Sequence, residues 1–239
     1  TSIGAISEDL LRYGGDGASP RPERLLALLR RMREIEGLGL IQTDHANIIS
    51  VAGWSDEQLR ELRALMVGES GSRYPWMNLG VETAAGTLLA RSGSAKLGGV
   101  APDEWGEFAA EQLRRLMRAG FMPMASLMLR LPGETEADVL RTLAWVERMA
   151  GEPLMIFPVL HAPIDGSPIP TRADLTSTHW RLVERCYDVN FREVPRVFFD
   201  GQTATGVPLA RRVAMQALGY GQVALWSALF AWWGARAEA

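Results

Sequence analysis

The fold is decided by residues 126–138, which read SLMLRLPGETEAD, and by residues 78–85, NLGVETAA, about one βα unit earlier. In each stretch a short apolar run ends at a turn that carries a carboxylate, Glu134 or Glu82, and a helix is expected to follow. A parallel α/β protein presents its ligand-binding groups in this way, at the carboxyl ends of its strands. The two stretches therefore predict an α/β fold.

The same alternation runs through the first two thirds of the chain. Apolar runs typical of strands cover residues 3–6, 38–43, 77–81, 124–129 and 154–160. Sequence with helical periodicity separates most of them, and strands joined by single helices must run parallel. Every run ends in polar residues, which favours a partial TIM-type barrel with one ring of loops. A flat doubly wound sheet is the alternative.

The pattern changes after the last strand. Residues 162–173 contain three prolines and predict an extended loop. A helix is expected over residues 178–189, and residues 207–239 predict two helices separated by Gly219-Tyr220-Gly221. We therefore divide the chain into a barrel domain, residues 1–170, and a C-terminal helical extension, residues 171–239.

Composition narrows the classes of function. The 239 residues are 47% hydrophobic and 22% charged, with a formal net charge of -3, which is ordinary for a globular protein. No block of Lys and Arg predicts binding to nucleic acid. Cys186 is the single cysteine, which fits a reducing, cytoplasmic compartment and excludes a multi-cysteine metal site within this sequence. The chain begins at Thr1 without a signal-peptide pattern, and we expect it to be a piece of a longer protein.

Carboxylates at the ends of the predicted strands are the main functional signal. They are Glu8, Asp9, Asp44, Glu82 and Glu134. A carboxylate at a barrel mouth can accept hydrogen bonds from ribose hydroxyls or from an ammonium group. For Asp9 and Glu134, capping of the next helix is an equal alternative. For Glu82 we favour ligand binding.

The histidines leave a second chemistry open. His45 and His161 follow predicted strands, so a metal-dependent barrel hydrolase that uses both is an alternative hypothesis. His45 also adjoins Asp44 and Asn47, and three polar groups on one loop favour a binding role. His179 is expected on the polar face of its helix. No nucleophile–base motif indicates a catalytic residue, and no metal-ligand set is assigned.

Residues 1–170 resemble the radical S-adenosylmethionine enzymes, in the group that often carries an upstream cobalamin-binding domain, because several short motifs occur in the same order as in that family. The motifs that carry the resemblance are Ser7-Glu8-Asp9 with Tyr13-Gly14, Asp44-His45-Ala46-Asn47, Gly80-Val81-Glu82-Thr83, Lys96 before Trp105, Leu131-Pro132-Gly133-Glu134-Thr135 and Phe157-Pro158-Val159. The ordered set is more specific than any one motif.

The resemblance implies a partial (βα)6 barrel that lacks its first strand and the three-cysteine loop for a [4Fe-4S] cluster. It implies that Ser7 and Glu8 bind the methionine amino group of S-adenosylmethionine, that Glu82 contacts the ribose, and that Leu131 and Pro132 meet the adenine. The cluster ligands, and any cobalamin, would then belong to an upstream domain. On this basis the present piece alone should be inactive.

A small-molecule or lipid-like substrate is expected at the same barrel mouth. The polar residues that we assign to it are Asp44, His45, Asn47, Arg130 and His161. Two features depart from the family pattern: Ala84-Ala85 replace Gly-Ser, and Arg130 replaces a glycine. They favour the competing hypothesis of a non-catalytic barrel that serves as an interaction or scaffold module.

The C-terminal tail needs a separate interpretation. Residues 223–233 contain one polar residue, Ser227, and Trp226, Phe230 and Trp233 share a helical face. A bilayer span needs about 20 apolar residues, so this run is too short. We expect a helix that packs on the barrel or on another domain. The alternative is an interfacial helix at a membrane surface, against which few cations accompany it.

Overall fold

The structure is a computed structural model that describes residues 2–17, 19–92, 95–163, 165–204 and 206–237. Its strands are all parallel. They are β1 (Ile3–Ala5), β2 (Ile41–Thr43), β3 (His45–Asn47), β4 (Trp76–Glu82), β5 (Met122–Leu129) and β6 (Met155–Leu160). β1 pairs with β2, and the other strands form a sheet in the order β3-β4-β5-β6.

Asp44 joins the two sheets into one array. Its backbone N–H donates to Ala5 O at 3.3 Å, and its carbonyl accepts from Asn78 N at 3.2 Å. Residues 41–47 therefore behave as a single strand, whose first half pairs with β1 and whose second half pairs with β4. This displacement along the strand is the stagger that a closing barrel requires. The polar segment at residues 44–47, expected as a loop, is thus partly strand.

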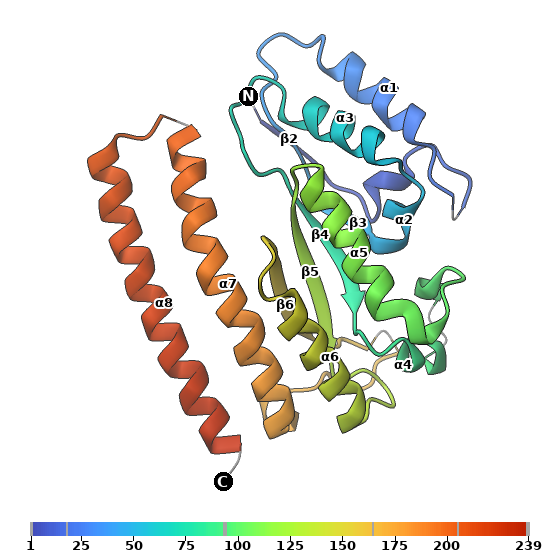
Figure 1. Cartoon of the computed structure of the whole chain (residues 1–239), viewed down its shortest axis with the longest axis vertical. Helices are drawn as coiled ribbons and strands as arrows, with labels where there is room; N and C mark the ends of the chain where they lie inside the picture. The colour runs from blue at the N-terminus through green and yellow to red at the C-terminus, as the bar shows by residue number, and fades with distance from the viewer. Residues whose placement is uncertain (1, 18, 93–94, 164, 205, 238–239) are drawn as a thin grey trace.

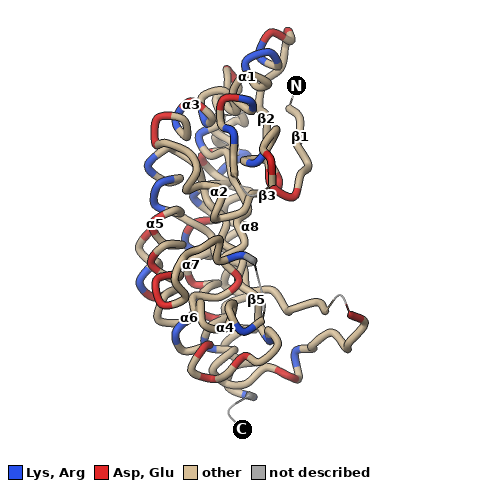
Figure 2. The backbone as a smooth tube through the Cα atoms, turned by 90° about the vertical axis from the view of Figure 1, so that its right-hand side faces the viewer, with Lys and Arg blue, Asp and Glu red and all other residues tan. Residues whose placement is uncertain are grey.

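The helices between strands lie on one side of the array, and Figure 2 shows the strands along the other side. These helices are α1 (Pro22–Met32), α2 (Ile48–Ala52), α3 (Asp56–Val67), α5 (Trp105–Arg118) and α6 (Glu136–Met149). A doubly wound sheet carries helices on both faces. The arrangement therefore confirms the partial barrel and rejects the flat alternative.

Strand residues alternate between the two faces. Leu79, Val81, Ala125, Leu127 and Ile156 are fully buried under the helices. Their neighbours in sequence, such as Asn78, Gly80, Met124 and Ser126, are only half-buried. The half-buried residues line the face that the helices leave uncovered, which corresponds to the inside of a barrel.

Short elements surround the carboxyl ends of the strands. They are the 3-10 helices η1 (Leu10–Arg12), η2 (Ala95–Leu97), η3 (Pro102–Glu104) and η4 (Arg172–Asp174), and α4 (Gly86–Arg91). Gly86 allows α4 to approach η3 closely, because a Cβ on this residue would lie 2.2 Å from Pro102 O. These elements and their loops form the rim on which the site residues lie.

The chain ends in two long helices, α7 (Ser177–Ala204) and α8 (Leu209–Ala237), which pack against each other in Figure 1. The helix expected at 178–189 is much longer than predicted. The prediction of two helices after residue 207 is wrong, because the single helix α8 continues through Gly219 and Gly221. Phe230 and Trp233 of α8 pack on aromatic rings of α7, and this pairing of the two helices outweighs the weak helix propensity of glycine.

α7 also covers the open edge of β6. Asn190, which is buried, accepts a hydrogen bond from Ile156 N and donates one to Ile156 O, both at 2.7 Å. The amide side chain takes the place of a neighbouring strand at this residue. The expected domain division at residue 170 stays a prediction, since α7 packs directly on β6 and α6.

Candidate functional site

A chain of hydrogen bonds crosses three strands on the uncovered face. His45 Nδ1 lies 3.0 Å from Asp44 Oδ2, and His45 Nε2 lies 2.9 Å from Asn78 Nδ2. Asn78 Oδ1 accepts from Ser126 Oγ at 2.7 Å. With Asn78 Nδ2 as the donor, His45 Nε2 accepts and the Nδ1 proton points to Asp44. The structure thus joins two predicted residues to Asn78 and Ser126, for which no role was predicted.

A carboxylate and an amine meet next to this chain of hydrogen bonds. Glu82, at the end of β4, pairs through Oε1 with Lys96 Nζ from η2. A Cβ on Gly80 would lie 2.5 Å from Glu82 Oε1 and 2.6 Å from Lys96 Nζ, so the pair lies directly against the Gly80 backbone. Burial lowers the pKa of Lys96. Glu82 Oε2 is buried and has no hydrogen-bond partner among the described residues.

Two non-glycine residues of the described part of the chain have a left-handed backbone, one at the end of β4 and one directly after β5. Glu82 and Arg130 each have φ 65°. Such a conformation is uncommon outside glycine and concentrates at functional sites. At Glu82 it accompanies a register shift between β4 and β5. The Arg130 side chain is exposed.

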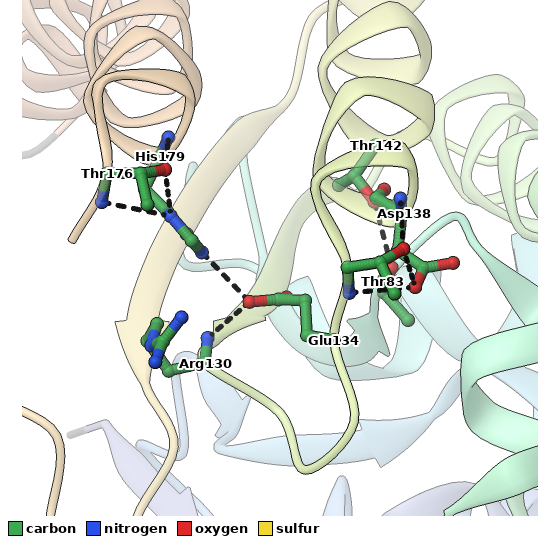
Figure 3. Close-up of polar contacts among 8 residues, drawn as sticks. Thr83, Arg130, Glu134, Asp138, Thr142, Thr176 and His179 are labelled. Atoms are coloured by element: carbon green, nitrogen blue, oxygen red, sulfur yellow. Dashed lines mark hydrogen bonds and ion pairs between the residues drawn. The ribbon is translucent and has the colours of Figure 1, made fainter. Parts of the chain in front are cut away.

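The turn after β5 is held by Glu134 (Figure 3). Glu134 Oε2 accepts from Arg130 N at 2.8 Å and lies 2.9 Å from His179 Nε2. Thr135 caps α6 instead, in a capping box with Asp138, so Glu134 does not cap the helix. The expectation that His179 lies on a polar helix face is wrong, because this side chain is 4% exposed.

The remaining predicted residues lie around the same rim. Ser7 and Glu8 follow β1, and Ser7 Oγ accepts from Asp9 N at 3.3 Å. Asn47 caps α2, accepting from Ile49 N at 3.3 Å. Leu131 and Pro132 form the turn after β5. The backbone N–H of His161 donates to Leu129 O at 2.9 Å, which extends the pairing of β6 with β5. Their proposed ligand contacts stay predictions.

Asp9 lies in a separate contact below the rim. Its Oδ2 accepts from Ser50 Oγ at 2.6 Å and lies 3.0 Å from Arg12 Nε. This ties the turn after β1 to α2, so a structural role accounts for one oxygen of the carboxylate. Within the part of the chain that the structure describes, no group of three or more His, Cys, Asp or Glu side chains is arranged to hold a metal ion.

The site fits part of the implied cofactor set. Glu82 Oε2, which is buried without a partner among the described residues and lies close to Gly80, suits a ribose hydroxyl, because a hydroxyl can donate to it. The cluster does not fit, because the thiol of Cys186 is buried inside α7 and burial raises its pKa. A cluster ligand must be a thiolate, and more than one is needed.

Comparisons with known proteins give limited results. No protein-family model and no curated protein sequence matches the chain. Among solved structures, the crystal structure of methylornithine synthase (PylB) superimposes with a TM-score of 0.47 and 14% sequence identity, over 78% of this chain and 48% of that one. The chain therefore spans about half the length of that protein, and a likeness of this size does not identify a family.

Proposed function

We propose that the chain is the barrel part of a radical S-adenosylmethionine enzyme. The observation that carries the proposal is the buried, half-satisfied carboxylate of Glu82 beside Gly80 and Lys96. The resemblance of the sequence assigns this residue to the ribose. The other assigned motifs, at Ser7, Glu8, Leu131 and Pro132, follow parallel strands at the same edge of the array.

The residues of this chain would bind and orient. Glu82 Oε2 would accept from a ribose hydroxyl, while Lys96 pairs with Oε1 and holds the carboxylate in place. S-adenosylmethionine held at this edge would supply radical chemistry, which the protein would orient and shield from water. The cluster ligands would come from residues outside this chain.

The substrate would lie along the uncovered face. His45, Asn78 and Ser126 form the polar chain there. The Asp44 carboxylate at one end of these hydrogen bonds can accept from a hydroxyl or an ammonium group of a small or lipid-like molecule. Arg130 and His161 are placed at the ends of β5 and β6, where an anionic substrate group would meet them.

The test uses the full-length protein with its cluster reconstituted without oxygen and then reduced. We expect 5′-deoxyadenosine to form from S-adenosylmethionine. Formation of S-adenosylhomocysteine as well would indicate methyl transfer and the upstream cobalamin-binding domain. Neither product, together with no binding of S-adenosylmethionine, would instead support the non-catalytic scaffold.

A binding measurement isolates the residue on which the proposal rests. Glu82→Gln should weaken binding of S-adenosylmethionine to the full-length protein about 10- to 100-fold, the effect of losing one charged hydrogen bond. Glu107→Gln, on the exposed side of α5, is the matched control and should bind as the wild type does. Equal affinity of Glu82→Gln and wild type would reject the ribose assignment.

A further inference from the structure

A pocket lies between the end of α8, the beginning of α7 and the segment that holds η4. Its volume is about 640 Å³, which is within the range of small-molecule sites. Three indole rings and two guanidinium groups contribute to its walls, and we call it the indole pocket. These side chains belong to Trp180, Trp232, Trp233, Arg172 and Arg236. Figure 1 shows the beginning of α7 beside the end of α8, far from α1. The indole pocket shares no residue with the candidate site around Glu82.

The indole rings form an inner and an outer part of the wall. The rings of Trp180 and Trp233 stand 5.8 Å apart between centroids, at an angle of 42°. Trp180 is 6% exposed, whereas Trp232 is 50% exposed. The inner ring is therefore fixed by packing, and solvent reaches the outer one. Indole rings bind another flat ring by offset stacking or by edge contacts.

Each guanidinium group lies against one of the indole rings. Arg172 Cζ stands 5.0 Å from the centroid of the Trp233 ring, and Arg236 Cζ stands 4.1 Å from that of the Trp232 ring. Arg236 and Trp232 are four residues apart on α8, so their contact joins no two elements and only fixes where the charge stands. A guanidinium stacked in this way keeps its N–H groups in its own plane, where they can donate to an anion.

The two positive charges of the indole pocket are not balanced within the described part of the chain. There, neither Arg172 nor Arg236 has an ion-pair partner or a side-chain hydrogen bond, and no acidic residue lines the pocket. Asp174 is near in sequence, but its Oδ2 accepts from the N–H and the hydroxyl of Thr171, at 2.7 Å and 2.8 Å. The pocket therefore has an excess of positive charge, which attracts an anion.

We propose that the indole pocket binds a small organic anion, namely a flat ring system that carries a phosphate or a carboxylate group. The ring would stack on the indoles. The anionic group would accept hydrogen bonds from the guanidinium groups of Arg172 and Arg236, which can bind phosphate and carboxylate alike through two parallel bonds. This site would bind its ligand whether or not the barrel binds S-adenosylmethionine.

A membrane surface is a less favourable ligand for these residues. Tryptophan and arginine also occur on helices that lie in a lipid interface. Here, however, Trp180 is buried, and the rings line a concave pocket. In the part of the chain that the structure describes, none of the helices combines the length and the hydropathy of a membrane span. The concave shape and the buried ring favour a small molecule.

The first test is isothermal titration calorimetry of the full-length protein with 1-naphthyl phosphate, which joins a flat ring to a phosphate. We expect a dissociation constant on the order of 0.1 mM, which is ordinary for a probe of this size. 1-Naphthoate carries a carboxylate instead, so the two titrations tell the anionic groups apart, and binding of either probe supports the proposal. The absence of binding by both probes at millimolar concentration would overturn it.

Two further probes separate the contributions of ring and charge. Neutral 1-naphthol keeps the ring, and inorganic phosphate keeps the charge. Each should bind at least about 10-fold more weakly than 1-naphthyl phosphate, because each loses one of the two sets of contacts. If either one binds as tightly as 1-naphthyl phosphate, the pocket does not recognise an aromatic anion and the proposal fails.

Variants place the probe in the indole pocket. Arg236→Gln should weaken binding of 1-naphthyl phosphate about 10-fold, because one charged donor is lost. Trp232→Ala should also weaken binding about 10-fold, and Trp232→Phe should restore most of the affinity because a flat ring returns. Both positions are exposed, so the variants should fold. Equal affinity of Arg236→Gln and wild type would contradict the proposed site.

Matched controls lie on the same two helices outside the pocket. Arg181→Gln on α7 and Tyr220→Ala on α8 change exposed residues that do not line it, and both should bind the probe as the wild type does. Flotation with phosphatidylcholine–phosphatidylglycerol vesicles tests the lipid alternative. Flotation that Arg236→Gln abolishes, combined with no binding of either naphthyl probe, would assign these residues to a membrane surface and reject the small-molecule site.

Discussion

His179 Nε2 and Glu134 Oε2 stand 2.9 Å apart, with side chains that are only 4% and 6% exposed. The contact joins α7 to the turn after β5. Thr176 N donates to His179 Nδ1 at 3.2 Å, so Nδ1 accepts and Nε2 carries the proton toward the carboxylate. The helical extension is thus fastened to a turn that bears three residues of the predicted site, Arg130, Leu131 and Pro132.

Removing the imidazole should destabilise the fold. We expect His179→Ala to lower the free energy of unfolding by about 3 kcal/mol, because Glu134 stays buried after losing its partner. Urea titration followed by tryptophan fluorescence measures this change. Arg181→Ala, at an exposed position of the same helix, should cost about 0.5 kcal/mol or less. Similar losses in the two variants would show that the contact contributes little.

The amide of Asn190 should be required at the edge of the sheet. In Asn190→Leu the N–H and the C=O of Ile156 lose their partners inside the protein, at a cost of about 2–4 kcal/mol for two buried groups. Hydrogen exchange of the Ile156 amide should also accelerate. Unchanged protection of that amide in Asn190→Leu would mean that the side chain does not replace a strand there.

The cap of α6 should depend on pH. Burial raises the pKa of Asp138, but the Thr135 hydrogen bonds and Arg91 outweigh it, so the pKa is lowered from 3.8. A lowered pKa in the folded state stabilises the fold above the unfolded pKa, and this contribution disappears as the pH falls through the folded value. Asp138→Asn should therefore cost about 1 kcal/mol near neutral pH and progressively less below pH 3.8.

The control for this effect is Glu147→Gln, at an exposed position of the same helix. It should show a stability difference of about 0.5 kcal/mol or less. Urea titrations of the three proteins at matched ionic strength, from neutral to acid pH, measure the differences. A constant difference between Asp138→Asn and wild type throughout that range is incompatible with the proposed linkage.

Cys186 should not react in the folded protein. Its side chain is fully buried in α7, and burial raises the pKa of the thiol, so the reactive thiolate is scarce. We expect no modification by an aromatic disulfide reagent until the chain is unfolded in guanidinium. Ser227→Cys, exposed on α8, should react within the mixing time. Rapid labelling of native Cys186 would show that α7 opens locally.

The order of elements could be predicted from the sequence because single segments encode it. The apolar runs around residues 77–81 and 124–129 have the length and burial pattern of strands. The extent of α7 and the continuity of α8 could not, because their pairing with each other overrides Pro195 and the glycines of residues 219–221. Local propensity does not report such tertiary contacts.

Some residues of the candidate site could be predicted from the sequence and others could not. Asp44, His45 and Glu82 were identified because polar residues directly follow apolar runs. Asn78 and Ser126 were not, because each sits inside a strand, and only the register between β4 and β5 brings them together. An alternation of polar and apolar residues in both strands is the signal that could have found them.

Because the Asn190 side chain takes the place of a strand beside β6, the two edges of the strand array differ. At β6 a side chain and a long helix block further addition, whereas β1 pairs on one side only among the described residues. The free edge of β1 is therefore where an added segment, whether from the same polypeptide or supplied as a peptide in trans, could pair with residues 3–5. The two edges of this partial barrel therefore differ in whether they can accept another strand.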